Sequence, residues 1–172
     1  TLEIIGAVTV TPSNMSITGS VVDAVNLNGA RGLYISGRYA YVAGNDGDTL
    51  SIIDITVPSS PVRVSTITDA TILDGARAVM VVGKYAYVVC QSATNNRIVV
   101  VDISNPNSMS ITGSLQDNTQ LAEVQGIYVV GNIAYVTCRA ATGYLTAVNI
   151  SIPTAPVILG SLTSAELAVA RT

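Results

Sequence analysis

Few residues in this chain could do chemistry. The sequence has no histidine and only two cysteines, Cys90 and Cys138. Without histidine there can be no His-based catalytic triad, no Cys-His pair and no His-containing metal site. We therefore expect the chain not to be an enzyme, to have no catalytic residue, and to need neither a cofactor nor a metal.

The acidic residues have a simpler interpretation as turn formers than as paired catalytic carboxylates. Asp54 and Asp102 stand at the same place before a proline turn, and Asn149 takes that place a third time. An Asp or Asn side chain can accept the N–H groups of a following turn, so the two residue types are interchangeable there. The segment Asn45-Asp46-Gly47-Asp48 has oxygen ligands suited to Ca²⁺ but lacks the bidentate glutamate of a recognised calcium loop. Since Asp-Gly is also a hairpin signal, we predict a turn.

One repeat position, which is basic in three of its four occurrences, forms the one candidate ligand-binding set, which consists of Arg31, Arg77, Gln125 and Arg171. Guanidinium groups recognise carboxylate or sulfate through paired hydrogen bonds. The alternative is that each arginine pairs with an acidic or carbonyl group of the neighbouring repeat, as interface arginines usually do. The sequence leaves both alternatives open.

These residues belong to a repeat that covers the chain. Four leucines lie in register, separated by 46, 48 and 46 residues, at Leu27, Leu73, Leu121 and Leu167. The register predicts complete repeats at 27–72, 73–120 and 121–166, the C-terminal half of a repeat at 1–26, and the start of another at 167–172. We expect the segment to be a fragment of a longer protein or a subunit completed by a neighbouring copy.

Each repeat predicts four short strands, at about 31–36, 39–44, 49–56 and 61–68 in the first, because β-branched and tyrosine-rich runs alternate with turn residues. Runs such as 78–82 and 98–101 are apolar on successive residues, so both faces of the sheet must be covered. Four-stranded antiparallel blades stacked around an axis meet this need. The predicted fold class is all-β, a β-propeller with three full blades at about 30–69, 76–116 and 124–163 and partial blades at both ends.

The repeated motifs resemble those of the LVIVD-repeat propellers, which are related to YVTN-like surface-protein propellers. The resemblance rests on Gly-Ala-Arg-Gly at 29–32, Gly-x-Tyr-Ala-Tyr-Val at 37–42 and 83–88, and the LVIVD-like blocks at 50–55, 98–103 and 145–150. It implies an extracellular or cell-surface location. It implies no activity, because the family is defined by its scaffold and has no shared catalytic motif.

In such a propeller the first strand of each blade is innermost, so the candidate arginines would ring the mouth of the central channel. We expect one of two functions. The first is a structural or adhesive module that associates with other copies or with the rest of a longer chain, as in a filament. The second is a ligand-binding module that recognises a small anion, sugar or peptide at the mouth, together with the loops near 44–49, 90–98 and 138–145.

Charge and hydropathy limit the partners. The net charge of −3 provides no basic stripe for phosphates, so we expect no nucleic-acid partner. No apolar stretch approaches the roughly 20 residues that would span a bilayer, so we expect no membrane insertion. Cys90 and Cys138 take the same place in adjacent repeats, and face-packed sheets lie about 10 Å apart. Because that is too far for a disulfide, we predict two separate buried thiols.

Overall fold

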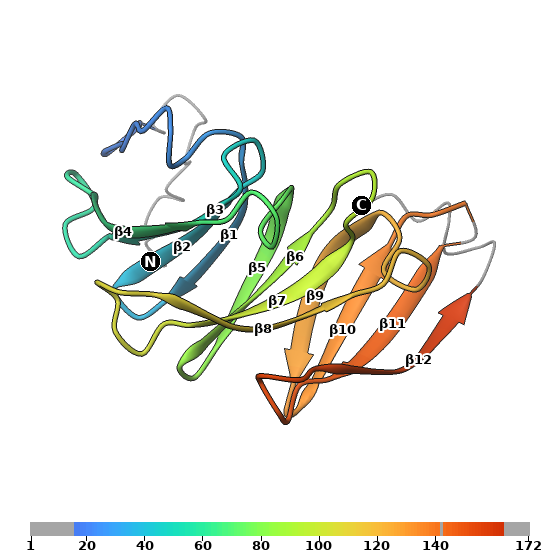
Figure 1. The fold of residues 1–172 in the computed structure, drawn as a ribbon. Helices are drawn as coiled ribbons and strands as arrows, with labels where there is room; N and C mark the ends of the chain where they lie inside the picture. The colour runs from blue at the N-terminus through green and yellow to red at the C-terminus, as the bar shows by residue number, and fades with distance from the viewer. Residues whose placement is uncertain (1–15, 142, 164–172) are drawn as a thin grey trace, which may run out of the picture.

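The computed structural model describes residues 16–141 and 143–163. In these ranges it contains twelve β-strands and no helix, arranged as three sheets of four strands that fan out side by side (Figure 1). Within the same ranges there is no helix long and apolar enough to cross a membrane. The predictions for residues 1–15 and 164–172, which include Arg171, concern positions outside the described residues.

The three sheets repeat one pattern, in which each strand pairs antiparallel with the next along the chain. The strands of the first sheet are β1 (Ala30–Ser36), β2 (Tyr39–Gly44), β3 (Thr49–Asp54) and β4 (Val62–Thr68). Those of the second are β5 (Ala76–Val82), β6 (Tyr85–Cys90), β7 (Arg97–Asp102) and β8 (Ser110–Gln116). Those of the third are β9 (Val124–Val130), β10 (Ile133–Cys138), β11 (Tyr144–Asn149) and β12 (Val157–Thr163). The predicted four-stranded antiparallel blades are confirmed.

The hairpin between the first two strands of each sheet needs a left-handed residue. Gly37, Gly83 and Gly131 supply it, with φ of 58°, 59° and 57°. Glycine adopts this conformation without the Cβ clash that other residues suffer. Tight hairpins therefore form at Gly37-Arg38 and Gly83-Lys84.

The third strand of the first sheet is shorter than predicted, because it ends at Asp54 and not at Thr56. The Asp54 side chain accepts the Thr56 N–H at 2.9 Å, which turns the chain out of the sheet. Asp102 accepts from Ser104 at 2.8 Å and Asn149 from Ser151 at 2.9 Å in the same way. The interpretation of these residues as turn formers is thus confirmed at all three positions.

Two apolar cores hold the sheets together, and the middle sheet contributes to both. Alternate residues of β6 point to opposite faces, so that Val88 packs toward the first sheet and Val89 toward the third. The side chains that fill each core are mainly aliphatic, with tyrosine, cysteine and methionine among them. This explains why the strand sequences are apolar on successive residues.

Short links between sheets are fixed by a capped aspartate and a buried leucine. Asp69 accepts N–H groups from Thr71 and Ile72, and Leu73 is fully buried four residues further on. Asp117 and Leu121 repeat this arrangement between the second and third sheets. Two of the four leucines that revealed the repeat in the sequence, Leu73 and Leu121, are thus the residues buried in the links between sheets.

Residues 16–22 form no strand, although their sequence copies the fourth strand of the other repeats. A strand requires a hydrogen-bonded neighbour, and the segment's neighbour in the repeat register lies outside the described residues. The segment still takes part of the place expected of a fourth strand. A Cβ on Gly19 would lie 2.3 Å from the Pro58 carbonyl oxygen, as one on Gly113 would lie 2.4 Å from that of Pro153. The assignment of 1–26 to half a blade remains a prediction.

The two cysteines lie in separate cores. Cys90 belongs to the core between the first and second sheets, and Cys138 to the core between the second and third. Both are buried and neither forms a disulfide. The prediction of two separate buried thiols is confirmed.

Candidate functional site

A polar pocket lies where the inner strands β1, β5 and β9 begin. Its volume is about 590 Å³, and it is open to solvent. Its walls come from all three sheets: Arg31, Asn45, Arg77, Gln91, Ser92, Ala93, Asn96, Asn118, Ala122, Glu123 and Arg139. Nine of these eleven side chains carry a polar or charged group, whereas the cores beside the pocket are apolar.

Two repeat positions supply most of the charge. Arg31 and Arg77 lie near the start of the innermost strand of their sheets, where the sequence placed them. The second position is the residue that directly follows the second strand, and it is Asn45, Gln91 or Arg139 in turn. A main-chain hydrogen bond fixes this second position in each repeat. The backbone N–H of Asn45, Gln91 or Arg139 donates to the carbonyl oxygen of Gly29, Gly75 or Glu123, respectively.

The other predicted ligand residues do not join the pocket wall. Gln125 uses its side-chain amide to donate to the carbonyl oxygen of Glu123 at 2.8 Å, within its own sheet. Arg171 lies outside the described residues. Arg77 donates to the side-chain oxygen of Gln91 in its own sheet, so the alternative of an acidic or carbonyl partner across the interface is not what this arginine adopts. Residues of all three expected loops line the pocket.

Glu123 is an exception among the repeats. The equivalent residues are Gly29 and Gly75, with φ of 62° and 71°, and Glu123 has the same left-handed backbone at φ 53°. A side chain there costs conformational energy that glycine avoids. Asn96 holds the backbone in place by accepting the Glu123 N–H at 3.1 Å. The strained position directs a carboxylate to the pocket, where its Oε2 lies 3.1 Å from Nε of Arg139.

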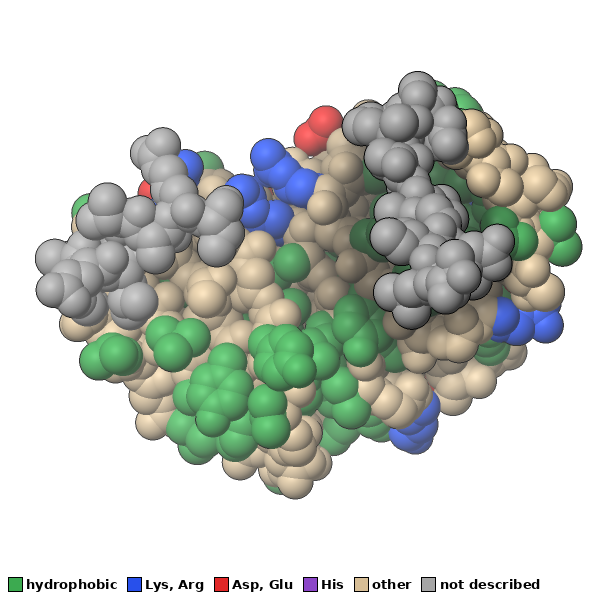
Figure 2. Space-filling model, turned by 180° about the vertical axis from the view of Figure 1, so that it is seen from behind, with side chains coloured by type: hydrophobic (Ala, Val, Ile, Leu, Met, Phe, Trp, Pro, Cys, Tyr) green, Lys and Arg blue, Asp and Glu red, His purple; other side chains and the backbone are tan. Residues whose placement is uncertain are grey.

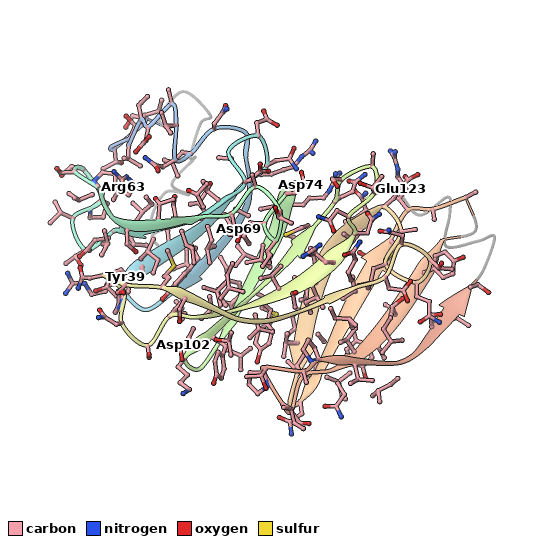
Figure 3. The ribbon with its side chains drawn as sticks, in the orientation of Figure 1. Tyr39, Arg63, Asp69, Asp74, Asp102 and Glu123 are labelled. Atoms are coloured by element: carbon pink, nitrogen blue, oxygen red, sulfur yellow. The ribbon has the colours of Figure 1, made fainter. Side chains whose placement is uncertain are left out.

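The electrostatics of the pocket are set by three guanidinium groups and one carboxylate. Partial burial lowers the pKa of Arg77, and the neighbouring Arg31 and Arg139 lower it further, while Glu123 opposes the shift. Figure 3 shows Glu123 and Asp74 at one edge of the sheets, with Asp102 and Tyr39 at the opposite edge. Figure 2 shows basic side chains gathered at the upper rim of the molecule. The pocket therefore has an excess of positive charge.

Sequence reasoning missed Glu123 and Arg139. Each departs from its repeat: a carboxylate replaces glycine at 123, and a cation replaces an amide at 139. Comparing the repeats for such departures would have pointed to both residues. The sequence does not show that these two residues lie near Arg77, because this proximity depends on how the second and third sheets stack.

The acidic turn at 45–48 serves the backbone. Asp48 has φ 52°, and its Oδ1 accepts the N–H of Gly75 in the next sheet at 2.9 Å. The predicted turn is confirmed. Within residues 16–141 and 143–163 no three His, Cys, Asp or Glu side chains gather into a group that could hold a metal ion.

A second surface of interest is the outer face of the third sheet. Tyr41 and Tyr87 are each 5% exposed, because the next sheet covers them, but the equivalent Tyr135 is 41% exposed. Leu50 and Ile98 are fully buried, whereas their equivalent Leu145 is 37% exposed. We call this surface the open face. Its exposed hydrophobic residues on β9 to β12 include Tyr128, Tyr135, Leu145, Leu159 and Leu162.

The open face contains an apolar hollow of about 340 Å³, lined by β10, β11 and β12 residues that include Tyr135, Leu145 and Leu162. Gly160 lies beside it and has no atom within 4 Å of the place a Cβ would occupy. Its repeat equivalent Gly113 is in close contact with the third sheet. The face thus has the form of an inner interface that no sheet within residues 16–141 and 143–163 covers, and Figure 2 shows hydrophobic side chains exposed on one side of the molecule.

A family assignment follows from the repeats. The LVIVD repeat family matches residues 29–69, 75–117 and 122–164, which coincide with the three sheets. The chain belongs to the LVIVD repeat family. No curated protein matches it.

Solved structures with the same fold include two described as candidate 6-phosphogluconolactonases. The protein from Bacteroides fragilis NCTC 9343 has a TM-score of 0.67 at 14% identity, over 80% of this chain and 40% of that one. The protein from Bacteroides uniformis ATCC 8492 has a TM-score of 0.67 at 16% identity, over 80% and 41%. A protein from Lactobacillus plantarum has a TM-score of 0.63 at 13% identity, over 77% and 41%. At these identities the likeness concerns the fold, and this LVIVD chain spans about 40% of their length.

Proposed function

We propose that this LVIVD chain is a non-enzymatic structural module whose open face stacks on a further propeller blade. The observation that carries the proposal is the exposure of Tyr135 and Leu145, whose equivalents in the first two sheets are buried by the next sheet. An exposed apolar surface of this kind is typical of an interaction site.

The partner that fits is another four-stranded sheet of the same repeat. The molecule itself contains two examples of such an interface, and in each the covering sheet presents small and β-branched residues, such as Val79 and Val81 against Tyr41. The structural neighbours support this partner, because three sheets correspond to about 40% of their chains, which are long enough for about seven blades.

The covering blade comes from a second copy when the chain is alone in solution. Leu33 and Ile35 on β1 of the first sheet are repeat equivalents of Val79 and Val81, and both are exposed. The first sheet of one copy therefore offers the same kind of surface that the second sheet offers to Tyr41. Such a head-to-tail contact builds a closed ring or a filament. We also propose an extracellular or cell-surface protein as the setting, on the basis of the family resemblance.

A charge on the open face tests the proposal. We expect Tyr135→Glu to reduce self-association by at least tenfold, because an ionised carboxylate cannot be desolvated against an apolar sheet at low cost. Sedimentation equilibrium over a range of concentrations measures the effect. Ile152→Glu is the control, since Ile152 is also exposed, at 60% against 41% for Tyr135, but lies in the turn after β11, away from the hollow. Equal association of the two variants would contradict the proposal.

A further inference from the structure

We propose that the polar pocket of Arg31, Arg77 and Arg139 binds a small oxyanion, a free ion or a small molecule bearing a carboxylate, phosphate or sulfate group. The inference is independent of the stacking role, because the pocket and the open face are lined by different residues. The sequence pointed to Arg31 and Arg77 as ligand-binding residues, but not to Arg139.

The charge of the pocket is the first argument. Three guanidinium groups line it against the single carboxylate of Glu123. Arg31 and Arg139 disfavour the charged form of Arg77, as the direction of its pKa shift indicates. An anion among the three groups removes this mutual repulsion and accepts their N–H donors, and guanidinium matches the geometry of a carboxylate or phosphate.

The state of the neighbouring groups is the second argument. The Ser92 hydroxyl lines the pocket, and its Oγ is buried with no hydrogen-bond partner in the described part of the chain. A buried hydroxyl normally has a partner, and a bound oxyanion supplies one. The Asn96 and Asn118 side chains are already engaged by backbone groups, so they shape the pocket and leave the binding to the arginines and Ser92.

Glu123 acts as an internal competitor for the same cations. Its carboxylate pairs with Arg139 and leaves Arg31 and Arg77 facing the cavity. Glycine occupies this place in the other two repeats, so Glu123→Gly converts the third repeat to the pattern of the first two. That variant removes the negative charge and the backbone strain together. We expect it to bind oxyanions more tightly than the wild-type chain.

Titration calorimetry with inorganic sulfate, inorganic phosphate and acetate, each at constant ionic strength maintained with chloride, tests the site. We expect saturable binding of at least one oxyanion, a loss of tenfold or more in Arg77→Gln, and a gain of threefold or more in Glu123→Gly. Arg38→Gln is the control, because Arg38 pairs with Asp54 at the end of β1 that lies away from Arg31, and this variant should bind like the wild type. Which ion saturates the site identifies its oxyanion class.

Absence of saturable binding for all three ions would overturn the proposal, and so would equal affinities of Arg77→Gln and the wild type. A loss in Arg38→Gln as large as that in Arg77→Gln would also overturn it, because the effect would then arise from net charge. Circular dichroism of each variant separates a lost site from a lost fold. Sedimentation equilibrium of the same variants measures their self-association, so a loss of oxyanion binding can be distinguished from a loss of stacking.

Discussion

At the scale of single residues, the capped aspartates link stability to pH. Hydrogen bonds from Arg38, and then from Thr56, lower the pKa of Asp54 from 3.8 to about 2. A carboxyl with a lowered pKa in the folded state stabilises the protein above its unfolded pKa and loses this contribution as pH falls through the folded value. Stability should therefore decrease between pH 4 and pH 2. Asp54 and Arg38 are solvent-screened, so the effect is small.

The variant Asp54→Asn separates charge from turn formation. Asparagine retains the turn, as Asn149 does in the third sheet, but removes the ion pair with Arg38. We expect the variant to be slightly less stable than the wild type at pH 6 and equally stable at pH 2. Urea unfolding at both pH values measures the difference. An equal loss at both values would show that the turn, and not the charge, was damaged.

The cysteines give a second test at this scale. Burial raises the pKa of Cys90 and raises that of Cys138 to about 12, so neither thiolate is accessible at pH 8. We expect thiol labelling of the native protein at pH 8 to be slow, and labelling of the denatured, unreduced protein to count two. Rapid native labelling would contradict the packing of the cores, and a count of zero would show that the thiols had joined in a disulfide.

At the scale of elements, the left-handed glycines in the link before β5 and in the hairpin between β5 and β6 are not equivalent. A Cβ on Gly75 would lie 2.0 Å from the Gln91 carbonyl oxygen, whereas one on Gly83 meets no atom within 4 Å. Both residues have positive φ. We expect Gly83→Ala to lower the free energy of unfolding by about 1 kcal/mol from backbone strain alone. Gly75→Ala should lower it by about 3 kcal/mol or more, because the clash adds to the strain.

Chemical denaturation of the two glycine variants measures this difference directly. Gly83→Ala serves as the control for φ, so the excess in Gly75→Ala reports the contact between the link and the loop after β6. Similar losses in the two variants would mean that the loop moves aside, and the close approach would not be a constraint on the fold.

The elements were largely predictable from the sequence, and the pocket was not. Strand positions followed from β-branched and tyrosine-rich runs, and equivalent residues such as Arg31 and Arg77 followed from the repeat register. The end of β3 was placed wrongly, because the Asp54 side chain competes with strand pairing. Glu123 and Arg139 were missed because they depart from the repeat and because their neighbours depend on the stacking of separate sheets.

At the scale of the whole molecule, the described residues form three sheets of a propeller, and none of these sheets covers the outer face of the third. A covering sheet buries Tyr41 and Tyr87, whereas the repeat-equivalent Tyr135 is exposed, because no described sheet covers it. Repetition within the chain thus provides its own control. The same apolar packing that joins the first sheet to the second should join the third sheet to a further blade.

The mass of the wild-type chain in solution tests this central claim most directly. We expect sedimentation equilibrium to give multiples of 17.7 kDa that increase with concentration, because the open face is desolvated in the associated form. A single species of 17.7 kDa at every concentration up to the millimolar range would contradict the claim, since the open face would then be stable in water.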